Sequence, residues 1–563
     1  MNEINPEIQA RIDRWLSSAF DEKTRSAVTE LLKNQEELID AFYTTLSFGT
    51  GGLRSLMGVG TNRMNDYTVS AATQGVSNYL KKTVSAPLSV FIGYDSRHHS
   101  KEFAEECAKV LAANKIHVYL CKEIRPTPFV SFGCRFKKCS AAIMITASHN
   151  PKEYNGYKVY WNDGAQVLPP HDVGIIDEVN KITKIGQIQK VADPHIEYVG
   201  EDLDDAYLKA IQPLLIYQEE NKNQGHTLHA IYTSLHGTGI TLIPQAFKNA
   251  GFSNISYVEK QCIPDGDFPT VKSPNPEEKA ALQLGIDMMH SKNGDLLIAN
   301  DPDADRVGVA VKHQNQTIVL NGNQIACILL NHICEGLTAT HKMPKRAAFI
   351  KTIVTTELFK AIVESYEKKC FEVLTGFKYI AEKIREWEND PNAPEYIFGA
   401  EESYGYLFGT LVRDKDAIST SLLIMEAALL AKLQGKTLID KLYEIYKKHG
   451  CFIEDVISVK FEETKAGKEA MQKGMDNLEK NPPVEINGIK VIAIEKRNKS
   501  KKSDMLIFWL EDGSKLIIRP SGTEPKIKIY GGVSLKEFDN IDNAIKACKE
   551  KVLTLCNALK TLF

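Results

Sequence analysis

The sequence lacks a strong excess of either charge. Among its 563 residues, 69 Lys and Arg are balanced by 72 Asp and Glu, which leaves a formal net charge of −3. This balance argues against a nucleic-acid partner, which would require a strongly basic surface. There is also no apolar run of 18 or more residues, and the first residues show no basic segment followed by an apolar one. These absences predict a cytoplasmic protein without a nucleic-acid or membrane partner, in which local Lys, Arg or metal meets any anionic ligand.

Signatures of several common sites are absent as well. The 11 cysteines contain no Cys-x-x-Cys pair, and Cys134 and Cys139 have no second Cys or His pair nearby to complete a zinc site. We therefore expect reduced, buried thiols. No P-loop or dinucleotide fingerprint occurs, because the Gly-x-Gly sequences at 58–60 and 237–239 lack the required third glycine.

The length and the apolar pattern predict several α/β domains. A chain of 563 residues is too long for one hydrophobic core, and 43% hydrophobic with 25% charged residues is typical of globular proteins. Apolar residues at helical spacing predict helices over 7–46. Short apolar runs, each followed by a loop or a helix, then predict successive βα units. These runs are 88–94, 141–146, 229–232, 295–299 and 346–350.

The last block of the chain has a different pattern. Short strands are expected at 491–494, 505–510, 515–518 and 526–530, followed by a helix over 535–556. This order is typical of an α+β module. Polar or glycine-containing stretches near 205, 320 and 452 separate the periodic blocks. The predicted domains are 1–205, 206–320, 321–452 and 453–563.

Ser148 follows the predicted strand 141–146, at the end of a strand, where α/β proteins place chemistry. Its hydroxyl is a candidate nucleophile, with His149 beside it to relay a proton. Taken alone, a serine in such a turn is more often a turn former or a helix cap. Likewise, His149 alone is more often a hydrogen-bonded loop residue.

Three carboxylates follow the predicted strand 295–299 at alternate positions, Asp301, Asp303 and Asp305. An EF-hand is excluded, since Arg306 occupies the sixth position and Lys312 the twelfth. Three carboxylates and a phosphate oxygen suit Mg²⁺, and Arg306 could hold the same phosphate. A solvated acidic loop is the alternative.

Two further loops bring polar groups to strand ends. Residues 519–525 combine Arg519, hydroxyls and Gly522 in an anion cradle, although an ordinary Pro-Gly turn has the same composition. Residues 399–405 supply carboxylates and a hydroxyl, which suit sugar hydroxyl groups. Lys415 lies in a charged run, 413–416, that is otherwise read as a solvated face. Together the four loops predict phosphoryl transfer on a sugar.

In this order and at this spacing, the loops resemble those of the α-D-phosphohexomutase superfamily, the phosphoglucomutase and phosphomannomutase family. The resemblance covers essentially the whole chain, with supporting matches at 49–54, 93–97, 375–378 and Lys415. It implies an α/β fold with four domains around a central cleft. Three would be related α/β domains with mixed sheets, and a C-terminal α+β domain would close over the substrate.

The resemblance also implies roles for individual residues. Ser148 would be phosphorylated in the active enzyme and would hold Mg²⁺ together with the three aspartates. The implied reaction centre further contains Arg54, Lys158, Lys415 and His149, of which the last three are alternatives for moving the proton. The implied substrate-binding residues are Thr375, Gly376, Lys378, Glu401, Ser403, Arg306, Arg519, Ser521, Gly522 and Thr523.

The implied activity is interconversion of glucose 1-phosphate and glucose 6-phosphate through a phosphoserine and a sugar 1,6-bisphosphate, which also serves as activator. The run 154–166 looks most like the longer branch of the family, with glucose-type mutases and phosphopentomutases. Ala400, Tyr404 and Ala417 depart from the common pattern, which leaves the substrate open. The alternatives are a phosphomannomutase, a phosphopentomutase, a sugar-bisphosphate synthase and a non-catalytic sugar-phosphate-binding protein.

Overall fold

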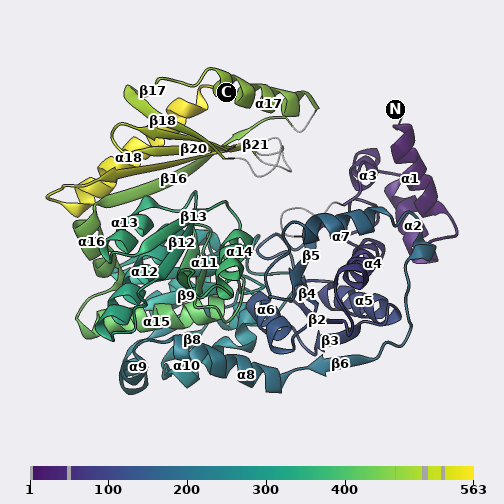
Figure 1. Cartoon of the computed structure of the whole chain (residues 1–563), viewed down its shortest axis with the longest axis horizontal. Coiled ribbons are helices and arrows are strands. Elements are labelled where there is room, and N and C mark those ends of the chain that lie inside the picture. Colours follow the sequence, from purple (N-terminus) through teal and green to yellow (C-terminus); the bar gives the residue numbers. More distant parts are fainter. Residues whose placement is uncertain (1–3, 47–51, 463–464, 498–504, 521–525) are drawn as a thin grey trace.

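Four β-sheets follow one another along the chain, each accompanied by helices (Figure 1). The computed structural model describes residues 4–46, 52–462, 465–497, 505–520 and 526–563. The predicted fold class is confirmed: three α/β domains precede a C-terminal α+β domain. The exact boundaries stay a prediction. Residue 320 is the last residue of β11 (Gln316–Leu320), whereas 205 lies within α8 (Glu201–Ile211) and 452 within β16 (Cys451–Lys460).

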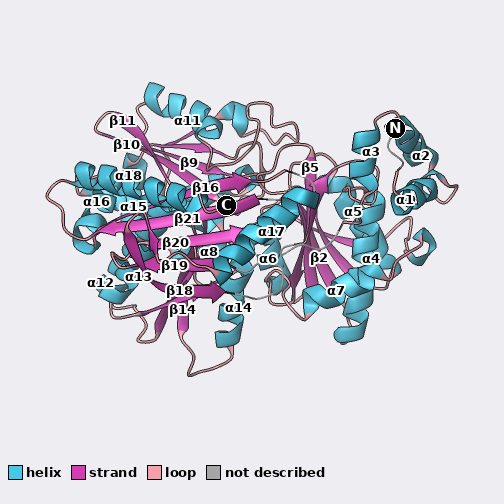
Figure 2. Cartoon of the chain, turned by 90° about the horizontal axis from the view of Figure 1, so that it is seen from above, coloured by secondary structure: helices cyan, strands magenta, loops and turns pink. Residues whose placement is uncertain are grey.

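The first sheet has the order β1-β5-β4-β2-β3-β6. Its strands are β1 (Leu53–Leu56), β2 (Ser89–Tyr94), β3 (His117–Cys121), β4 (Ala141–Ile145), β5 (Tyr154–Trp161) and β6 (Ile196–Val199). Its helices are α4 (Asp66–Thr83), α5 (Ser100–Ala113), α6 (Thr127–Phe136) and α7 (His171–Asn180), and they cover both faces (Figure 2). Because both faces are covered, every residue of β4 is buried, which explains its continuous apolar run.

The predicted N-terminal helices form a small separate core. They are α1 (Pro6–Leu16), α2 (Glu22–Leu31) and α3 (Gln35–Phe42). Trp15 lies at the centre of this core, with its ring 4.5 Å from that of Phe20 and 5.7 Å from that of Phe42. The helical spacing of apolar residues thus correctly predicted this segment.

The second and third sheets are also mixed, with orders β11-β10-β9-β7-β8 and β13-β12-β14-β15. The second contains β7 (Ala230–Thr233), β8 (Ile255–Tyr257), β9 (Leu296–Asn300), β10 (Val307–His313) and β11 (Gln316–Leu320), with α9 (Gln218–Gln224), α10 (Ile243–Ala250) and α11 (Lys279–Ser291). The third contains β12 (Ala347–Thr352), β13 (Lys369–Val373), β14 (Glu395–Glu401) and β15 (Gly405–Phe408), with α12 (Gly322–Ala339), α13 (Glu357–Ser365), α14 (Phe377–Glu388), α15 (Ala417–Leu433) and α16 (Leu438–His449).

Helix α15 is apolar on nearly all sides and almost wholly buried. Within the described part of the chain, no single helix is long and apolar enough to cross a membrane. Among the described residues, the pair α15 and α16 together is long and apolar enough to do so, although the two helices meet at an 85° bend.

The fourth sheet is antiparallel, with the order β16-β21-β20-β19-β18-β17. It contains β17 (Glu485–Ile486), β18 (Ile489–Arg497), β19 (Met505–Leu510), β20 (Lys515–Pro520) and β21 (Lys526–Leu535), with α17 (Lys465–Lys480) and α18 (Ile541–Lys560). The last helix was predicted to begin at 535. It begins at Ile541 because β21 pairs with β16 as far as Leu535.

Strand β16 joins the third domain to the fourth and was not predicted from the sequence. Its side chain Glu454 reaches back to the third domain, where it accepts hydrogen bonds from Thr356 Oγ1 and, at 3.3 Å, from Asn323 Nδ2. Burial raises the pKa of Glu454 to about 7, against the opposing effect of the bond from Thr356. The carboxyl therefore favours its protonated form when the protein is folded.

We expect the variant Glu454→Gln to raise the melting temperature at pH 8. The pKa of Glu454 in the folded protein exceeds the unfolded value of about 4.3. Its contribution to stability is therefore greatest below about pH 4.3 and is lost as the pH rises through 7. Glutamine stays neutral, and the gain over the parent should be about 2–4 °C at pH 8 and smaller at pH 5. Thermal unfolding at both pH values, with Asp455→Asn as an exposed control, checks this; an equal shift at both pH values would contradict it.

Candidate active site

The loop after β4 holds Ser148 in an unusual conformation and directs its hydroxyl to the second domain. Ser148 has a φ of 51°, in the left-handed region that residues other than glycine seldom adopt. Its N–H donates to Thr146 Oγ1 at 2.8 Å. Its hydroxyl donates to Asp301 Oδ2 at 2.7 Å and lies 3.1 Å from His149 Nδ1. The predicted nucleophile thus lies between an imidazole and a carboxylate.

A buried arginine fixes this loop by its backbone. Arg97 donates to the carbonyl groups of Ser148, Asn150, Pro151 (2.8 Å) and Tyr154 (3.1 Å). These four bonds over-determine the path of the loop, which explains how the strained conformation of Ser148 persists. In the sequence, residues 93–97 were only a supporting match to the family. No sequence pattern links Arg97 to the Ser148 loop, which lies about 50 residues later.

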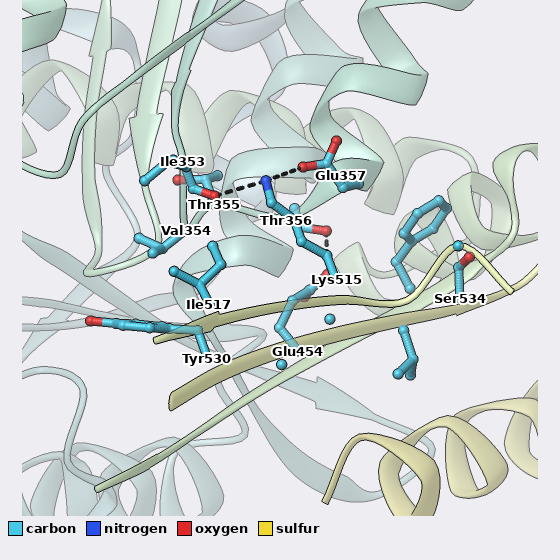
Figure 3. Close-up of a pocket in the computed structure, with 15 residues that line it drawn as sticks. Ile353, Val354, Thr355, Thr356, Glu357, Glu454, Lys515, Ile517, Tyr530 and Ser534 are labelled. Carbon is cyan, nitrogen blue, oxygen red and sulfur yellow. Dashed lines mark hydrogen bonds and ion pairs between the residues drawn. The ribbon is translucent and has the colours of Figure 1, made fainter. Parts of the chain in front are cut away.

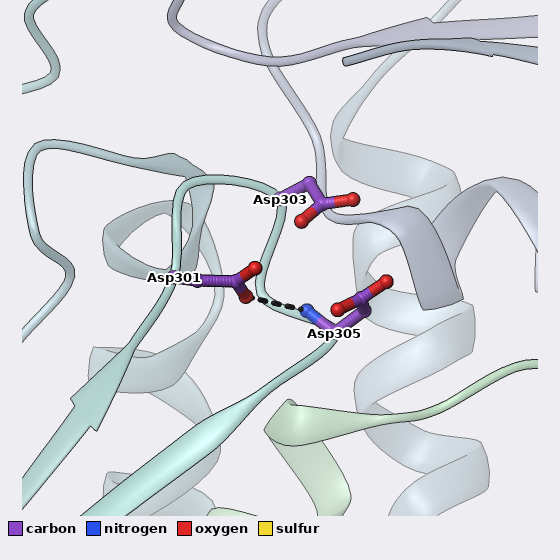
Figure 4. A group of neighbouring side chains, drawn as sticks. All are labelled: Asp301, Asp303 and Asp305. Atoms are coloured by element: carbon purple, nitrogen blue, oxygen red, sulfur yellow. Dashed lines mark hydrogen bonds between the residues drawn. The ribbon is translucent and has the colours of Figure 1, made fainter. Parts of the chain in front are cut away.

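The three predicted aspartates converge on the turn between β9 and β10 (Figure 4). One oxygen from each of Asp301, Asp303 and Asp305 lies within 4.8 Å of the others, and all three side chains are buried. Asp301 Oδ1 accepts the N–H groups of Asp305 (3.1 Å) and Arg306 (3.0 Å). Burial and the other two carboxylates raise the pKa of Asp301 well above its usual range.

The aspartate cluster fits a divalent cation. The Oδ1 atoms of Asp303 and Asp305 are buried and have no hydrogen-bond partner. An unpaired buried carboxylate oxygen is costly, and a hard cation with oxygen ligands would satisfy both atoms. The sequence pattern correctly indicated that these side chains lie together.

Two lysines from different domains flank the aspartates. Lys158 on β5 contacts Asp303 Oδ2 at 2.7 Å and Asp305 Oδ2 at 3.1 Å. Lys415 contacts Asp305 Oδ2 at 3.1 Å and Asp414 Oδ1 at 3.2 Å. Burial lowers the pKa of both ammonium groups, but the carboxylates outweigh it and raise the pKa. Lys415 therefore belongs to a buried ion cluster, so the solvated-face reading of 413–416 is wrong.

Residues from the other predicted loops border this centre. Arg54 is exposed and donates to Asn150 Oδ1 at 3.1 Å, beside the serine loop. Arg306 pairs with Glu277. Burial, followed by the charges of Arg306 and Arg54, lowers the pKa of His149 well below its usual value, so the imidazole is neutral.

The candidate sugar site combines the turn between β13 and α14 with the turn between β14 and β15. The Gly376 N–H donates to Glu401 Oε1 at 2.8 Å, and Gly376 has a φ of 114°, which disfavours any side chain there. Lys378 is buried, whereas Thr375 and Ser403 are half-buried. Two of the predicted residues, Gly376 and Glu401, are thus in direct contact.

The candidate phosphate loop is only partly described. Arg519 lies near the end of β20, on the fourth sheet. The predicted residues Ser521, Gly522 and Thr523 lie outside the described residues.

Three positioning contacts were not predicted from the sequence. Thr127 Oγ1, at the start of α6, donates to Asp303 Oδ2 at 2.7 Å. Asp414 Oδ2 accepts from Tyr160 (3.0 Å) and Gln166 (2.8 Å), which fixes the carboxylate beside Lys415. No local pattern could have identified these residues, because each contact joins different domains.

The arrangement is suited to phosphoryl transfer. That chemistry depends on placing the reacting groups and neutralising the charge on the phosphoryl oxygens. Here a serine hydroxyl, a carboxylate cluster that fits a divalent cation and two lysines lie within one buried centre.

Comparisons with known proteins agree with this geometry. Models of phosphoglucomutase/phosphomannomutase α/β/α domains I, II and III match residues 45–186, 205–315 and 321–449. The phosphoglucomutase of Staphylococcus haemolyticus is 36% identical over 95% of this chain and 98% of its own length, and that of Staphylococcus aureus is 37% identical over 95% and 97%. Among solved structures, the open form of parafusin, a phosphoglucomutase from Paramecium, has a TM-score of 0.70 at 20% identity and covers 92% of this chain and 96% of its own. A phosphoglucomutase/phosphomannomutase family protein from Burkholderia thailandensis has a TM-score of 0.66 at 17% identity, covering 91% and 97%.

Proposed function

The chain belongs to the phosphoglucomutase/phosphomannomutase family and is a phosphosugar mutase, and from that premise we propose that it interconverts glucose 1-phosphate and glucose 6-phosphate. One observation supports glucose as the sugar: the relatives matched along nearly their whole length are phosphoglucomutases. The placement of Ser148 against the aspartate cluster supports a phosphoserine mechanism. We place the enzyme in the cytoplasm, in keeping with its 11 free cysteines.

In the proposed reaction, phosphoserine 148 donates its phosphoryl group to the free hydroxyl of the sugar monophosphate. The sugar oxygen forms a bond to phosphorus and gives up its proton to the neutral imidazole of His149, while the bond between phosphorus and Ser148 Oγ breaks. Oγ keeps the electron pair of that bond and takes up the proton. The resulting 1,6-bisphosphate reverses its orientation in the cleft and returns its other phosphoryl group to Ser148. Added sugar 1,6-bisphosphate acts as an activator because it phosphorylates Ser148.

The residues of the centre have separate tasks. Asp301, Asp303 and Asp305 would hold Mg²⁺ together with an oxygen of the serine phosphate. When bound, Mg²⁺ offsets the negative charge on the transferring group. Lys158 and Lys415 supply further positive charge, and the neutral imidazole of His149 lies within reach of the Ser148 proton.

The binding residues would orient the sugar. Glu401 offers a carboxylate oxygen to sugar hydroxyl groups, with Ser403 and Thr375 beside it as hydroxyl partners. The backbone of Gly376 keeps Glu401 in place through its hydrogen bond. Arg519, with the loop at 521–523, would bind the phosphate that is not being transferred, because a guanidinium can form two parallel bonds to it. Arg306 and Lys378 complete the cationic lining.

A coupled assay tests the proposed substrate. The purified protein is supplied with Mg²⁺, a trace of the matching sugar bisphosphate, and glucose 1-phosphate, mannose 1-phosphate or ribose 1-phosphate. We expect the largest kcat/KM for glucose 1-phosphate, by about tenfold or more, since loss of one matched polar contact has effects of this size or larger. A preference for mannose or ribose phosphate would overturn the assignment to glucose but keep the phosphoserine mechanism.

A further inference from the structure

Four charged side chains meet where the third and fourth domains touch. Lys351 (β12), Glu357 (α13) and Glu372 (β13) belong to the third domain, and Lys515 comes from the start of β20 in the fourth. Lys515 Nζ lies 2.8 Å from Glu357 Oε1 and 3.1 Å from Glu372 Oε2, and Lys351 Nζ lies 3.0 and 2.9 Å from the same two oxygens. We name these four residues the clasp.

Two backbone carbonyl groups of the third domain also accept hydrogen bonds from the lysines of the clasp. Lys515 Nζ also donates to the carbonyl of Ile353 at 3.0 Å, and Lys351 Nζ donates to that of Thr355 at 3.0 Å. Figure 3 shows Lys515 reaching away from its own strand toward Glu357. A side chain of the fourth domain is therefore held by three acceptors of the third.

An apolar contact between the two domains lies beside the clasp. Ile353 and Val354 of the third domain pack against Met505, Ile507 and Ile517 of the fourth. The cavity beside these residues has a volume of about 30 Å³, which accommodates only a few water molecules (Figure 3). The charged groups of the clasp interact with one another beside this cavity.

The two sides of the clasp lead directly to the binding loops. Lys515 lies four residues before Arg519 along β20, a distance of roughly 13 Å in an extended strand. Glu372 lies three residues before Thr375, at the start of the candidate sugar loop. Each contact at the clasp thus sets the direction of an element that ends at the substrate.

Charge balance makes the clasp sensitive to the position of the fourth domain. The charges of the two lysines and two glutamates sum to zero, and both lysine side chains are at least nine-tenths buried. If the fourth domain moved away with Lys515, Lys351 would face two carboxylates alone. Arg497 of β18 approaches Glu372 only to 3.9 Å and is 48% exposed, and it would move away with the fourth domain as well, so it would not compensate. Removing one partner from such a cluster is costly.

We propose that Lys515 is a positioning residue, which fixes the fourth domain against the third so that Arg519 faces the sugar loop at the distance a sugar phosphate requires. The assignment of the two loops to sugar and phosphate rests on the proposed function. Lys515 Nζ is directed to its three acceptors in the third domain, and its effect on Arg519 is transmitted by the strand β20.

The variant Lys515→Met tests the proposal, because it keeps the aliphatic stem and removes the charge. We expect KM for the sugar phosphate to rise about tenfold, with kcat changed less than threefold, and the radius of gyration from small-angle X-ray scattering to increase. Lys515→Arg should restore most of the parental KM. The double variant Lys515→Met with Glu357→Gln restores charge balance, so its KM should lie below that of Lys515→Met.

Lys490→Met is the matched control, since Lys490 is an exposed lysine of the same sheet. The proposal is overturned if Lys515→Met and Lys490→Met have the same KM and the same radius of gyration. It is also overturned if Lys515→Met lowers kcat and leaves KM unchanged. Scattering needs no turnover, so a parent protein inactive on glucose phosphate would refute the proposed function while the clasp is still tested.

Discussion

The variant Ser148→Ala is expected to lose mutase activity by on the order of 10⁴-fold or more while still binding sugar phosphate. Alanine removes the only atom that would carry the phosphoryl group. The neighbouring hydroxyl of Thr146 is not free to replace it, since it donates to Asp95 Oδ2 at 2.6 Å and accepts the Ser148 N–H. The coupled assay measures turnover, calorimetry measures binding, and intact-protein mass spectrometry after incubation with bisphosphate reports the phosphoserine.

The control for this variant is Ser140→Ala. Ser140 precedes the same strand, and its hydroxyl accepts only a backbone N–H, from Ser89 at 3.3 Å. Its loss should alter stability slightly and leave kcat unchanged. If Ser148→Ala retains parental activity, or if bisphosphate still adds a phosphoryl group to it, the phosphoserine mechanism is refuted.

Much of the site was predictable because its parts are local. Ser148 and the aspartates each follow a buried apolar strand. In α/β proteins the functional residues commonly lie at the carboxyl ends of such strands. Spacing alone could indicate that alternate aspartates converge. The resemblance to the family then supplied the expectation that the loops meet, and the contact between Ser148 and Asp301 agrees with it.

The parts that could not be predicted depend on tertiary contacts. Thr127 reaches Asp303 across 176 positions, and Tyr160 reaches Asp414 across 254. These pairs have no periodicity and no motif, so only the folded chain brings them together. Strand β16 was missed for another reason: beyond Ile453 its residues are half-buried or exposed, because one end of the strand leaves the core. An apolar pattern identifies strands only where they are buried.

The variant Asp303→Asn is expected to weaken Mg²⁺ binding by about 100-fold. The two oxygens of Asp303 have different surroundings: Oδ2 accepts from Thr127 and Lys158, whereas Oδ1 is buried without a partner and is free for a cation. An amide keeps the shape of the side chain but removes the charge that a hard cation requires. The variant Thr127→Val removes the hydrogen bond that orients Oδ2. It should weaken Mg²⁺ binding by only about tenfold, because a residue that orients a metal ligand contributes less than the ligand itself.

Titration calorimetry with Mg²⁺ or Mn²⁺ measures these affinities without turnover, and kcat measured against Mg²⁺ concentration should show the same order. Asp287→Asn, an exposed aspartate of the same domain, is the control. A loss of cation affinity in Asp303→Asn that exceeds the loss in Thr127→Val, with Asp287→Asn unchanged, identifies the carboxylate itself as the ligand. Equal affinity in all four proteins would mean that the cluster holds no cation. The unpaired oxygens of Asp303 and Asp305 would then have to be satisfied by Lys158 and Lys415, whose ammonium groups already lie between 2.7 and 3.1 Å from the opposite oxygens.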